Sequence, residues 1–358
     1  MKAAVAYEPG APLVVEDVEP LPLGPRDVLV RIAASGICHT DVTVIDGLSA
    51  LPLPIVPGHE GCGTVEEVGP EVRRVRVGDR VLASVSPACG SCWWCVNGMT
   101  NRCEIGPTVL TTPRNRLGDG RQVPSVCGCG TFAEAMVVHE ASVVAVQTDL
   151  PDEELALLGC GVTTGLGAAL NTAGVVPGSS VAVIGCGGVG QSVVQGARIA
   201  GALTIVAVDP AAARRSASVA LGATHAVDPT AGDPVEQVRA LTSGRGADHT
   251  FEVVGRPELM VQAHEMARPG GTVVLVGMPH KDAVLSLPAL TAVFSGKRIV
   301  GSKVGDAQIL RDFPRFIRLA EAGRVDLGSL VSRRIALADI NDGIAAVDRA
   351  EGVRTVIV

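Results

Sequence analysis

The pattern of hydrophobic and polar positions divides the chain into two parts. Up to about residue 150, short runs rich in Val, Ile and Leu are separated by turns that carry Pro and Gly, which predicts a β-rich domain. These runs lie at residues 28–32, 63–68, 80–85 and 135–138. From residue 178, short and wholly apolar stretches alternate with amphipathic ones, which is typical of a parallel sheet covered by helices on both faces.

Strands and helices are predicted in turn along the second part of the chain. The predicted strands are residues 180–184, 204–208, 225–227, 249–253 and 272–276. The predicted helices are residues 191–200, 211–221, 234–242 and 257–267. A further strand, a helix and a closing strand are predicted at residues 298–304, 309–322 and 355–358. The expected fold class is therefore α/β, with a doubly wound parallel sheet following a β-rich domain.

Composition and charge exclude several classes of protein. The 358 residues favour two or three domains, and a content of 47% hydrophobic and 19% charged residues is ordinary for a globular protein. Aromatic residues make up only 2%, so we expect an aliphatic core. The formal net charge of -7 provides no positive field, and we expect no nucleic-acid partner.

Residues 155–197 contain no charged residue and are the candidate for a membrane span. Asn171, Pro177 and many glycines interrupt them, so no window has the roughly 18 consecutive apolar residues that a spanning helix needs. The N-terminus has neither an apolar core nor a cleavage site, and we expect a cytoplasmic protein without a signal peptide or membrane contact. The 10 cysteines are then expected to be metal ligands or buried thiols.

A glycine-rich loop follows the first strand of the predicted parallel sheet. It consists of Gly185, Cys186, Gly187, Gly188, Val189 and Gly190. This pattern after a strand and before a helix is typical of a dinucleotide site, where backbone N–H groups at the helix N-terminus bind a diphosphate. Asp209 ends the next strand, where an acidic residue binds ribose hydroxyls and repels a 2′-phosphate, so we expect NAD. The alternative is NADP, bound with help from Arg214 and Arg215.

Four cysteines are clustered in one loop, at Cys89, Cys92, Cys95 and Cys103. Four soft thiolate ligands in this spacing favour a zinc ion or an iron–sulfur cluster. Four thiolates leave a zinc ion no open position, so a zinc here would stabilise the fold and perform no chemistry. We therefore predict a structural zinc site, with an iron–sulfur cluster as the alternative.

The chain resembles the medium-chain zinc-dependent alcohol dehydrogenases over nearly its whole length. The motifs that carry the resemblance are Gly58-His59-Glu60 followed by Gly63, Gly69 and Val72, the four-cysteine loop, Gly159-Cys160-Gly161 and the glycine-rich loop. The resemblance implies a GroES-like catalytic domain at residues 1–161 and a Rossmann domain at 162–303. It also implies that residues 304–358 return to the catalytic domain.

The resemblance implies a second metal site, formed by Cys38, His59 and Cys160, that binds a catalytic zinc. Two thiolates and one neutral imidazole balance the charge of the ion and leave it an open position, so it can act as a Lewis acid. In the family, Thr40 would hydrogen-bond the substrate oxygen and begin a proton relay. Asp41 would orient His59 from outside the metal shell.

Other site residues follow from the same resemblance. Glu60 would lie behind the catalytic zinc, and His39 would either lie beside the cofactor diphosphate or serve the proton relay. Thr43 stands where liver-type members have a relay histidine, so this chain departs from them at the last relay step. The resemblance places further residues at the cofactor: Thr164 and Val189 in the nicotinamide pocket, Val253 after the fourth strand, and Arg354 at the diphosphate.

The function that these expectations favour is hydride transfer between NAD and a primary or secondary alcohol, or the corresponding aldehyde or ketone, with two zinc ions per subunit. Residues 155–171 also resemble branches that oxidise the adduct of formaldehyde with glutathione or mycothiol. A zinc- and NAD-binding protein without catalysis is a third interpretation, although it would not need Cys38, His59, Cys160 and Thr40 together. A homodimer or homotetramer is expected, because the strand at 298–304 often pairs between subunits in this family.

Overall fold

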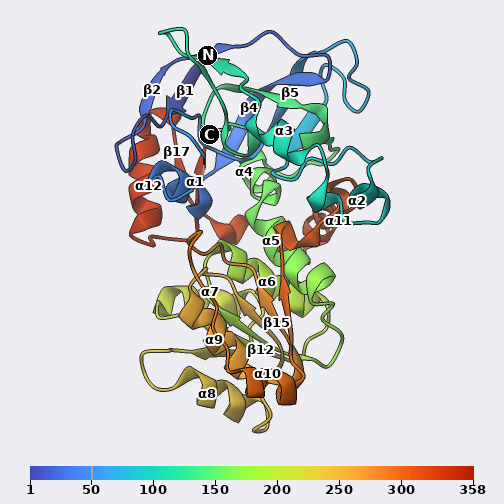
Figure 1. The fold of residues 1–358 in the computed structure, drawn as a ribbon, viewed down its shortest axis with the longest axis vertical. Coiled ribbons are helices and arrows are strands. Elements are labelled where there is room, and N and C mark those ends of the chain that lie inside the picture. Colours follow the sequence, from blue (N-terminus) through green and yellow to red (C-terminus); the bar gives the residue numbers. More distant parts are fainter. Residues whose placement is uncertain (50) are drawn as a thin grey trace. The chain divides into compact units, whose positions relative to one another are not determined.

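The computed structural model describes residues 1–49 and 51–358. It consists of two compact units (Figure 1). One unit contains Met1–Gly161 together with Gln308–Val358, and the other contains Val162–Ala307. Each unit has its own sheet and its own core, and the two are described separately.

The first unit is built on a sheet of seven strands, in the order β10-β6-β5-β4-β18-β17 with β9 also paired to β4. The strands are β4 (Asp27–Gly36), β5 (Glu60–Val68), β6 (Arg80–Ala83), β9 (Ala135–His139), β10 (Val143–Ala145), β17 (Val331–Ile335) and β18 (Arg354–Ile357). All four residues of β18 are buried, and Val356 pairs with Gly36 of β4. The C-terminal segment therefore adds the strands β17 and β18 to a sheet whose other strands come from the N-terminal segment.

Smaller elements surround this sheet. The short strands are β1 (Lys2–Val5), β2 (Val14–Asp17), β3 (Glu19–Pro20), β7 (Asn115–Arg116) and β8 (Gln122–Val123). The α-helices are α1 (His39–Ile45), α2 (Trp93–Val96), α3 (Gly106–Thr111), α4 (Asp152–Ala156), α11 (Ile309–Glu321) and α12 (Ile340–Asp348). The core is aliphatic as predicted, and Phe132 is among the few aromatic residues in it.

The second unit contains a six-stranded sheet in the order β13-β12-β11-β14-β15-β16, in which every neighbouring pair is parallel. Its strands are β11 (Ser180–Ile184), β12 (Thr204–Val208), β13 (His225–Val227), β14 (Ala247–Glu252), β15 (Ala267–Leu275) and β16 (Arg298–Gly301). The chain order reverses between β11 and β14, and ligands of such sheets bind at this point, outside the carboxyl ends of the strands.

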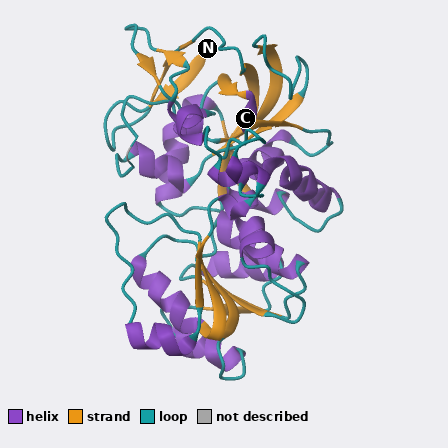
Figure 2. Cartoon of the chain, turned by 45° about the vertical axis from the view of Figure 1, so that its right-hand side comes forward, coloured by secondary structure: helices purple, strands orange, loops and turns teal. Residues whose placement is uncertain are grey.

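Helices flank this sheet on both sides (Figure 2). The helices of this unit are α5 (Gly161–Gly167), α6 (Gly188–Ile199), α7 (Ala212–Ala220), α8 (Pro234–Leu241), α9 (Pro257–Met266) and α10 (Ala289–Ser295). Helix α6 packs on β11 and β12 and contacts α7, whereas α9 packs on β14 and β15 and contacts α8. The predicted doubly wound parallel sheet is thus confirmed, and the predicted strands at 180–184, 204–208 and 225–227 coincide with β11, β12 and β13.

The last predicted strand of this sheet is shorter than expected. Strand β16 ends at Gly301, because Val304, Gly305 and Asp306 have positive φ angles of 54°, 64° and 46°, which no strand can accommodate. Gly305 packs against Gly167: a Cβ added to Gly167 would lie 2.3 Å from the Gly305 carbonyl oxygen. The Gly305 carbonyl also accepts a hydrogen bond from the Asn171 side chain. This packing keeps residues 304–307 in the second unit.

Among the described residues, no single helix has the length and apolar character needed to cross a membrane. One pair, Asp152–Gly159 and Gly161–Thr172, meets that requirement only when its two halves, bent by 57°, are counted together.

Candidate active site

The first unit brings four potential metal ligands together. Ligand atoms of Cys38, His59, Glu60 and Cys160 all lie within 4.8 Å of one another. Cys38 follows β4, His59 immediately precedes β5, and these strands are paired side by side. Cys160 reaches the same point from the short helical turn η4 (Leu157–Gly159), which contacts β5. Residues separated by more than 120 positions thus share one site.

A buried carboxylate sets the orientation of the histidine. Asp41 Oδ1 lies 2.8 Å from His59 Nδ1 and accepts a hydrogen bond from the Gly58 N–H, and its Oδ2 accepts one from the Cys38 N–H. With the Nδ1 hydrogen directed at Asp41, the lone pair of the neutral imidazole is on Nε2. Nε2 is buried and has no hydrogen-bond partner among the described residues. It is therefore a donor atom that a metal ion would satisfy.

The electrostatics of the two thiols also fit a cation. A hydrogen bond from Cys160 lowers the pKa of the Cys38 thiol, and the same contact raises the pKa of Cys160. Burial would lower the pKa of His59, but the charges of Asp41 and Cys160 outweigh it and raise the pKa. The protonation of each of these three side chains therefore depends on the other two. Two sulfurs and one imidazole are a set of metal ligands typical of an open, catalytic zinc site.

Glu60 and Arg354 form a buried ion pair behind these ligands. Glu60 Oε1 lies 3.3 Å from Arg354 Nη2 and accepts a hydrogen bond from the Gly161 N–H. Burial raises the pKa of Glu60 to about 7, although Arg354 opposes this shift. Glu60 Oε2 is buried without a partner in the described residues, so it is a spare oxygen beside the cluster.

Arg354 reaches this position because residue 161 is glycine. A Cβ at Gly161 would lie 1.8 Å from Arg354 Nη2, which no side chain could avoid without displacing the guanidinium. Arg354 also donates to the Ile37 carbonyl oxygen, next to Cys38. Within the first unit, the arginine expected at the cofactor diphosphate thus contacts the metal site, and its role toward the diphosphate stays a prediction.

The first turn of α1 carries the residues predicted for proton transfer. Thr40 is half-buried, two residues after Cys38, and His39 is exposed. The Thr43 hydroxyl donates to the His39 carbonyl oxygen over 3.1 Å. The residue that replaces the relay histidine of liver-type members is therefore hydrogen-bonded within its own helix, and the roles of Thr40 and His39 stay predictions.

The four-cysteine loop forms a second cluster, with its four sulfurs within 4.8 Å of one another. The Cys89 and Cys95 sulfurs are 3.9 Å apart, and those of Cys92 and Cys103 are 3.8 Å apart. Zinc–sulfur bonds of about 2.3 Å place tetrahedral sulfurs about 3.8 Å apart, so this spacing fits one zinc ion. Burial raises the pKa of Cys89, but amide hydrogen bonds from Ser91 and Cys92 outweigh it and lower the pKa to about 6.

The glycine-rich loop of the second unit lies at the carboxyl end of β11, where the strand order reverses. A Cβ at Gly190 would lie 1.9 Å from the Gly185 carbonyl oxygen, so the loop can turn this tightly only with glycine. A Cβ at Gly187 would meet none of the described residues within 4 Å, so this side of the loop is open. The open backbone at the start of α6 fits the diphosphate of a dinucleotide.

Other predicted cofactor residues surround this loop. Asp209 follows β12, and its carboxylate accepts hydrogen bonds from the Cys186 and Ala211 N–H groups, both over 2.8 Å. Val253 follows β14, and its side chain would be 3.3 Å from a Cβ at Gly190. The remaining predicted residues are Val189 at the start of α6, Gly188 beside it, Thr164 on α5, and half-buried Arg214 on α7.

Arg215, considered for an NADP phosphate, has other partners. It donates to the Asp209 and Pro210 carbonyl oxygens and forms an ion pair of 2.9 Å with Asp228. Its guanidinium therefore fixes the chain after β12 rather than standing free for a ligand.

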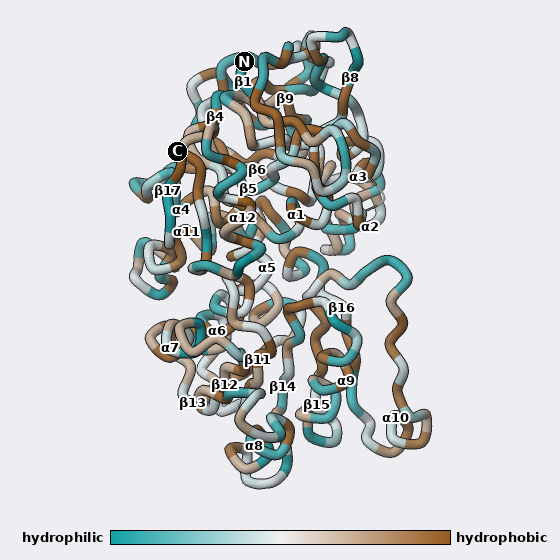
Figure 3. Tube along the Cα trace, turned by 90° about the vertical axis from the view of Figure 1, so that its left-hand side faces the viewer, coloured by the Kyte–Doolittle hydropathy of each residue, from teal (hydrophilic) through white to brown (hydrophobic). Residues whose placement is uncertain are grey.

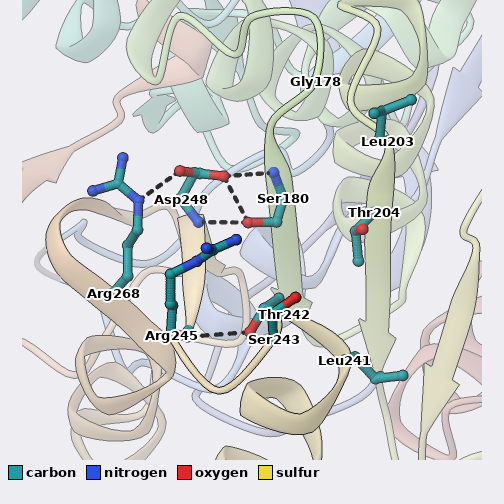
Figure 4. A pocket seen from close by; sticks show the side chains of 11 residues that line it. Gly178, Ser180, Leu203, Thr204, Leu241, Thr242, Ser243, Arg245, Asp248 and Arg268 are labelled. Carbon is teal, nitrogen blue, oxygen red and sulfur yellow. Dashed lines mark hydrogen bonds and ion pairs between the residues drawn. The ribbon is translucent and has the colours of Figure 1, made fainter.

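A cavity of about 490 Å³ lies at the opposite end of this sheet, where β11 and β14 begin (Figure 4). Asp248 forms part of the cavity wall. Its carboxylate accepts a hydrogen bond from the Ser180 hydroxyl and forms an ion pair of 2.6 Å with Arg268. This cavity is at the amino ends of the strands and does not belong to the dinucleotide site.

Comparison with known proteins identifies both units. The alcohol dehydrogenase GroES-like domain model matches residues 24–148, and the zinc-binding dehydrogenase model matches residues 188–322. The chain is 40% identical to geraniol dehydrogenase of Castellaniella defragrans, over 100% of this chain and 97% of that protein. It is 37% identical to S-(hydroxymethyl)glutathione dehydrogenase of a Synechocystis strain, over 99% of each. The crystal structure of benzyl alcohol dehydrogenase from Acinetobacter calcoaceticus matches it with a TM-score of 0.93 and 31% identity, over 99% and 98% of the two chains.

Replacement of one cysteine of the four-sulfur cluster tests whether this cluster binds a structural metal ion that is separate from the catalytic one. We expect Cys95→Ala to lose about one metal equivalent per subunit and to lower the melting temperature, because three thiolates hold a structural ion poorly. Elemental analysis and calorimetry would measure both effects. Unchanged metal content and melting temperature would contradict a structural ion at this cluster.

Proposed function

The chain belongs to the medium-chain zinc-dependent alcohol dehydrogenase family and is an oxidoreductase that acts on alcohols, and we propose that it transfers hydride between a primary or secondary alcohol and NAD. The observation that carries this proposal is the donor set of Cys38, His59 and Cys160 around one point, with His59 Nε2 unpartnered. A protein that only bound zinc and dinucleotide would have no use for an open metal site.

Cys38, His59 and Cys160 would hold the catalytic zinc, and the four-cysteine loop would hold a structural one. When bound, the catalytic zinc supplies a Lewis acid that stabilises negative charge on the alcohol oxygen. Asp41 contributes by keeping the His59 Nε2 lone pair available and by fixing the Cys38 backbone. Glu60 is buried beside the ligands with a free oxygen, so it would modulate the charge of the site.

Thr40 is the residue that would accept the substrate proton. Its hydroxyl is at the first turn of α1, two residues from Cys38, and half-buried, so it can contact a substrate and still reach solvent. His39 is exposed beside it, whereas the Thr43 hydroxyl is bonded to the His39 carbonyl. The proton would therefore leave from Thr40 toward solvent or His39, without passing through Thr43.

Asp209 favours NAD over NADP. Its buried carboxylate carries negative charge at the end of β12, where ribose hydroxyls bind and a 2′-phosphate would be repelled. Arg215, a possible partner for that phosphate, is already paired with Asp228. Thr164, Val189 and Val253 would line the nicotinamide part of the site.

The experiment that tests this function is a steady-state assay with primary, secondary, allylic and aromatic alcohols, each with NAD and with NADP. We expect turnover with at least one of these classes, a preference for NAD because of Asp209, and no requirement for a thiol. One curated relative is named an S-(hydroxymethyl)glutathione dehydrogenase, so formaldehyde is included with and without glutathione or mycothiol. Activity restricted to formaldehyde plus thiol would replace the proposed substrate class, and no reduction of either cofactor would reject the function.

A single ligand variant tests the open metal site. We expect Cys160→Ser to lower kcat by more than about 100-fold. Loss of a residue that only hydrogen-bonds a metal ligand already lowers metal affinity or activity by up to about 100-fold, and loss of a ligand itself should cost at least as much. NADH affinity, measured by fluorescence titration, should be unchanged, because the glycine loop belongs to the other unit. The control is Cys127→Ser, the same change at a half-buried cysteine outside both clusters. Wild-type kcat in Cys160→Ser would overturn the assignment.

A second copy of the chain would cover an apolar surface of the second unit. Helix α10 has no buried residue, and Leu290, Val293 and Phe294 are 72%, 75% and 81% exposed. Figure 3 shows hydrophobic residues in this segment, and Ile299 of the edge strand β16 is 40% exposed. Exposed apolar clusters of this kind usually mark an interface, which supports the homodimer or homotetramer expected for the family.

A charged residue introduced into this surface would test whether it forms the interface. We expect Phe294→Glu to shift the wild-type oligomer to smaller species at micromolar concentration, because a carboxylate would be buried without a partner. Light scattering after size exclusion would measure the mass, and Leu203→Glu, at a position 74% exposed away from α10 and β16, is the control. A monomeric wild type, or an unchanged mass in Phe294→Glu, would exclude this surface as the interface.

A further inference from the structure

Two buried side chains hold the glycine-rich loop at Cys186. The Cys186 N–H donates to Asp209 Oδ2 over 2.8 Å, and the Cys186 carbonyl oxygen accepts a hydrogen bond from Gln191 Nε2 over 3.0 Å. Gln191 is in the first turn of α6, and only 1% of it is exposed. No motif pattern singles out this glutamine, which stands next to the last glycine of the loop.

The glycines on either side of Cys186 explain why the loop needs to be held. Gly185 has a φ of +91°, and neither it nor Gly187 has a Cβ to restrict rotation, so the peptide units between them turn at little cost. The Cys186 carbonyl and the Gly187 N–H belong to the same planar trans peptide and point in opposite directions. Gln191, by binding the carbonyl toward α6, therefore turns the Gly187 N–H away from α6.

The direction of that N–H matters because the loop is open there. In the part of the chain that the structure describes, a Cβ at Gly187 would meet nothing within 4 Å, whereas a Cβ at Gly185 would be 2.5 Å from Val254 Cγ2. The space at Gly187 is thus the place on the loop where a ligand can approach the backbone. A diphosphate at a helix N-terminus is bound by such outward N–H groups.

We propose that Gln191 is a positioning residue that presets the Gly187 N–H for the diphosphate of the dinucleotide cofactor. The inference rests on the proposed use of NAD, and it adds a residue that contacts the loop and not the ligand. Asp209 fixes the peptide before Cys186 and Gln191 fixes the one after it, so two successive peptide units are preorganised. An amide that is already oriented need not be ordered during binding, which strengthens binding.

The oxygen of the Gln191 side-chain amide distinguishes this positioning role from a purely structural one. Gln191 Oε1 is buried and has no hydrogen-bond partner among the described residues. An unsatisfied buried oxygen lowers the stability of the folded protein, so an apolar side chain of similar length would remove this cost. Methionine or leucine at this position would remove this cost but would leave the buried Cys186 carbonyl without its Gln191 donor, so the two effects on stability oppose each other while the loop loses its restraint.

The test compares cofactor affinity with stability in Gln191→Met and Gln191→Leu. Isothermal titration would measure binding of NADH, of ADP-ribose, which retains the diphosphate, and of adenosine, which lacks it. We expect both variants to bind NADH and ADP-ribose about fivefold more weakly, the change that one net hydrogen bond gives. Adenosine affinity should not fall, and the melting temperature without cofactor should change no more than it does in Gln195→Met. Gln195→Met, a change at a fully buried glutamine one turn further along α6, should retain wild-type NADH affinity.

Three results would overturn the inference. The first is wild-type NADH affinity in both Gln191 variants. The second is weaker NADH binding by Gln195→Met as well as by the Gln191 variants, which would indicate general destabilisation. The third is an equal loss of adenosine affinity, which would place the effect away from the diphosphate. Absence of NADH binding by the wild-type protein would instead reject the proposed cofactor, and with it the premise of this inference.

Discussion

The Asp41 carboxylate is the contact on which the metal site depends. It is fully buried, and it joins the chain after β4 to the chain before β5 by binding the Cys38 N–H, the Gly58 N–H and His59 Nδ1. A buried carboxylate is stable only when its oxygens are satisfied, so these three contacts hold one another in place. Without it, nothing would orient Cys38, after the end of β4, and His59, before the start of β5, toward the same point.

The same physical arrangement recurs at the other loops that carry site residues. Glu60 binds the Gly161 N–H beside Cys160, Asp209 binds the Cys186 N–H in the glycine loop, and Glu252 binds the Val254 and Gly255 N–H groups after β14. In each case a buried carboxylate accepts hydrogen bonds from the backbone of a loop that has no ladder partner of its own. Backbone N–H groups in loops with functional residues are thereby satisfied, which favours the observed loop conformations.

The parts that were predictable from the sequence are those with local patterns. The strands β11, β12 and β13 were predicted to the residue, because each is a short apolar run between polar turns. Helix α5 was missed within the uncharged stretch at 155–197, where a buried helix has no polar face to give a period. Strand β16 was predicted too long, because the left-handed turn at 304–306 depends on packing against Gly167 and not on local sequence.

The sequence by itself determined the chemistry that this protein has available: a four-cysteine loop, a glycine-rich turn between a strand and a helix, and the order of motifs that identifies the family. These are encoded in spacing along the chain, which local geometry translates directly into structure. Only the tertiary structure decided which distant groups meet. Arg354 reaches Glu60 through the insertion of β18 beside β4, and Asp209 reaches Cys186 through the pairing of β11 with β12. Such contacts depend on strand pairing and on close packing between glycines, and neither leaves a local pattern in the sequence.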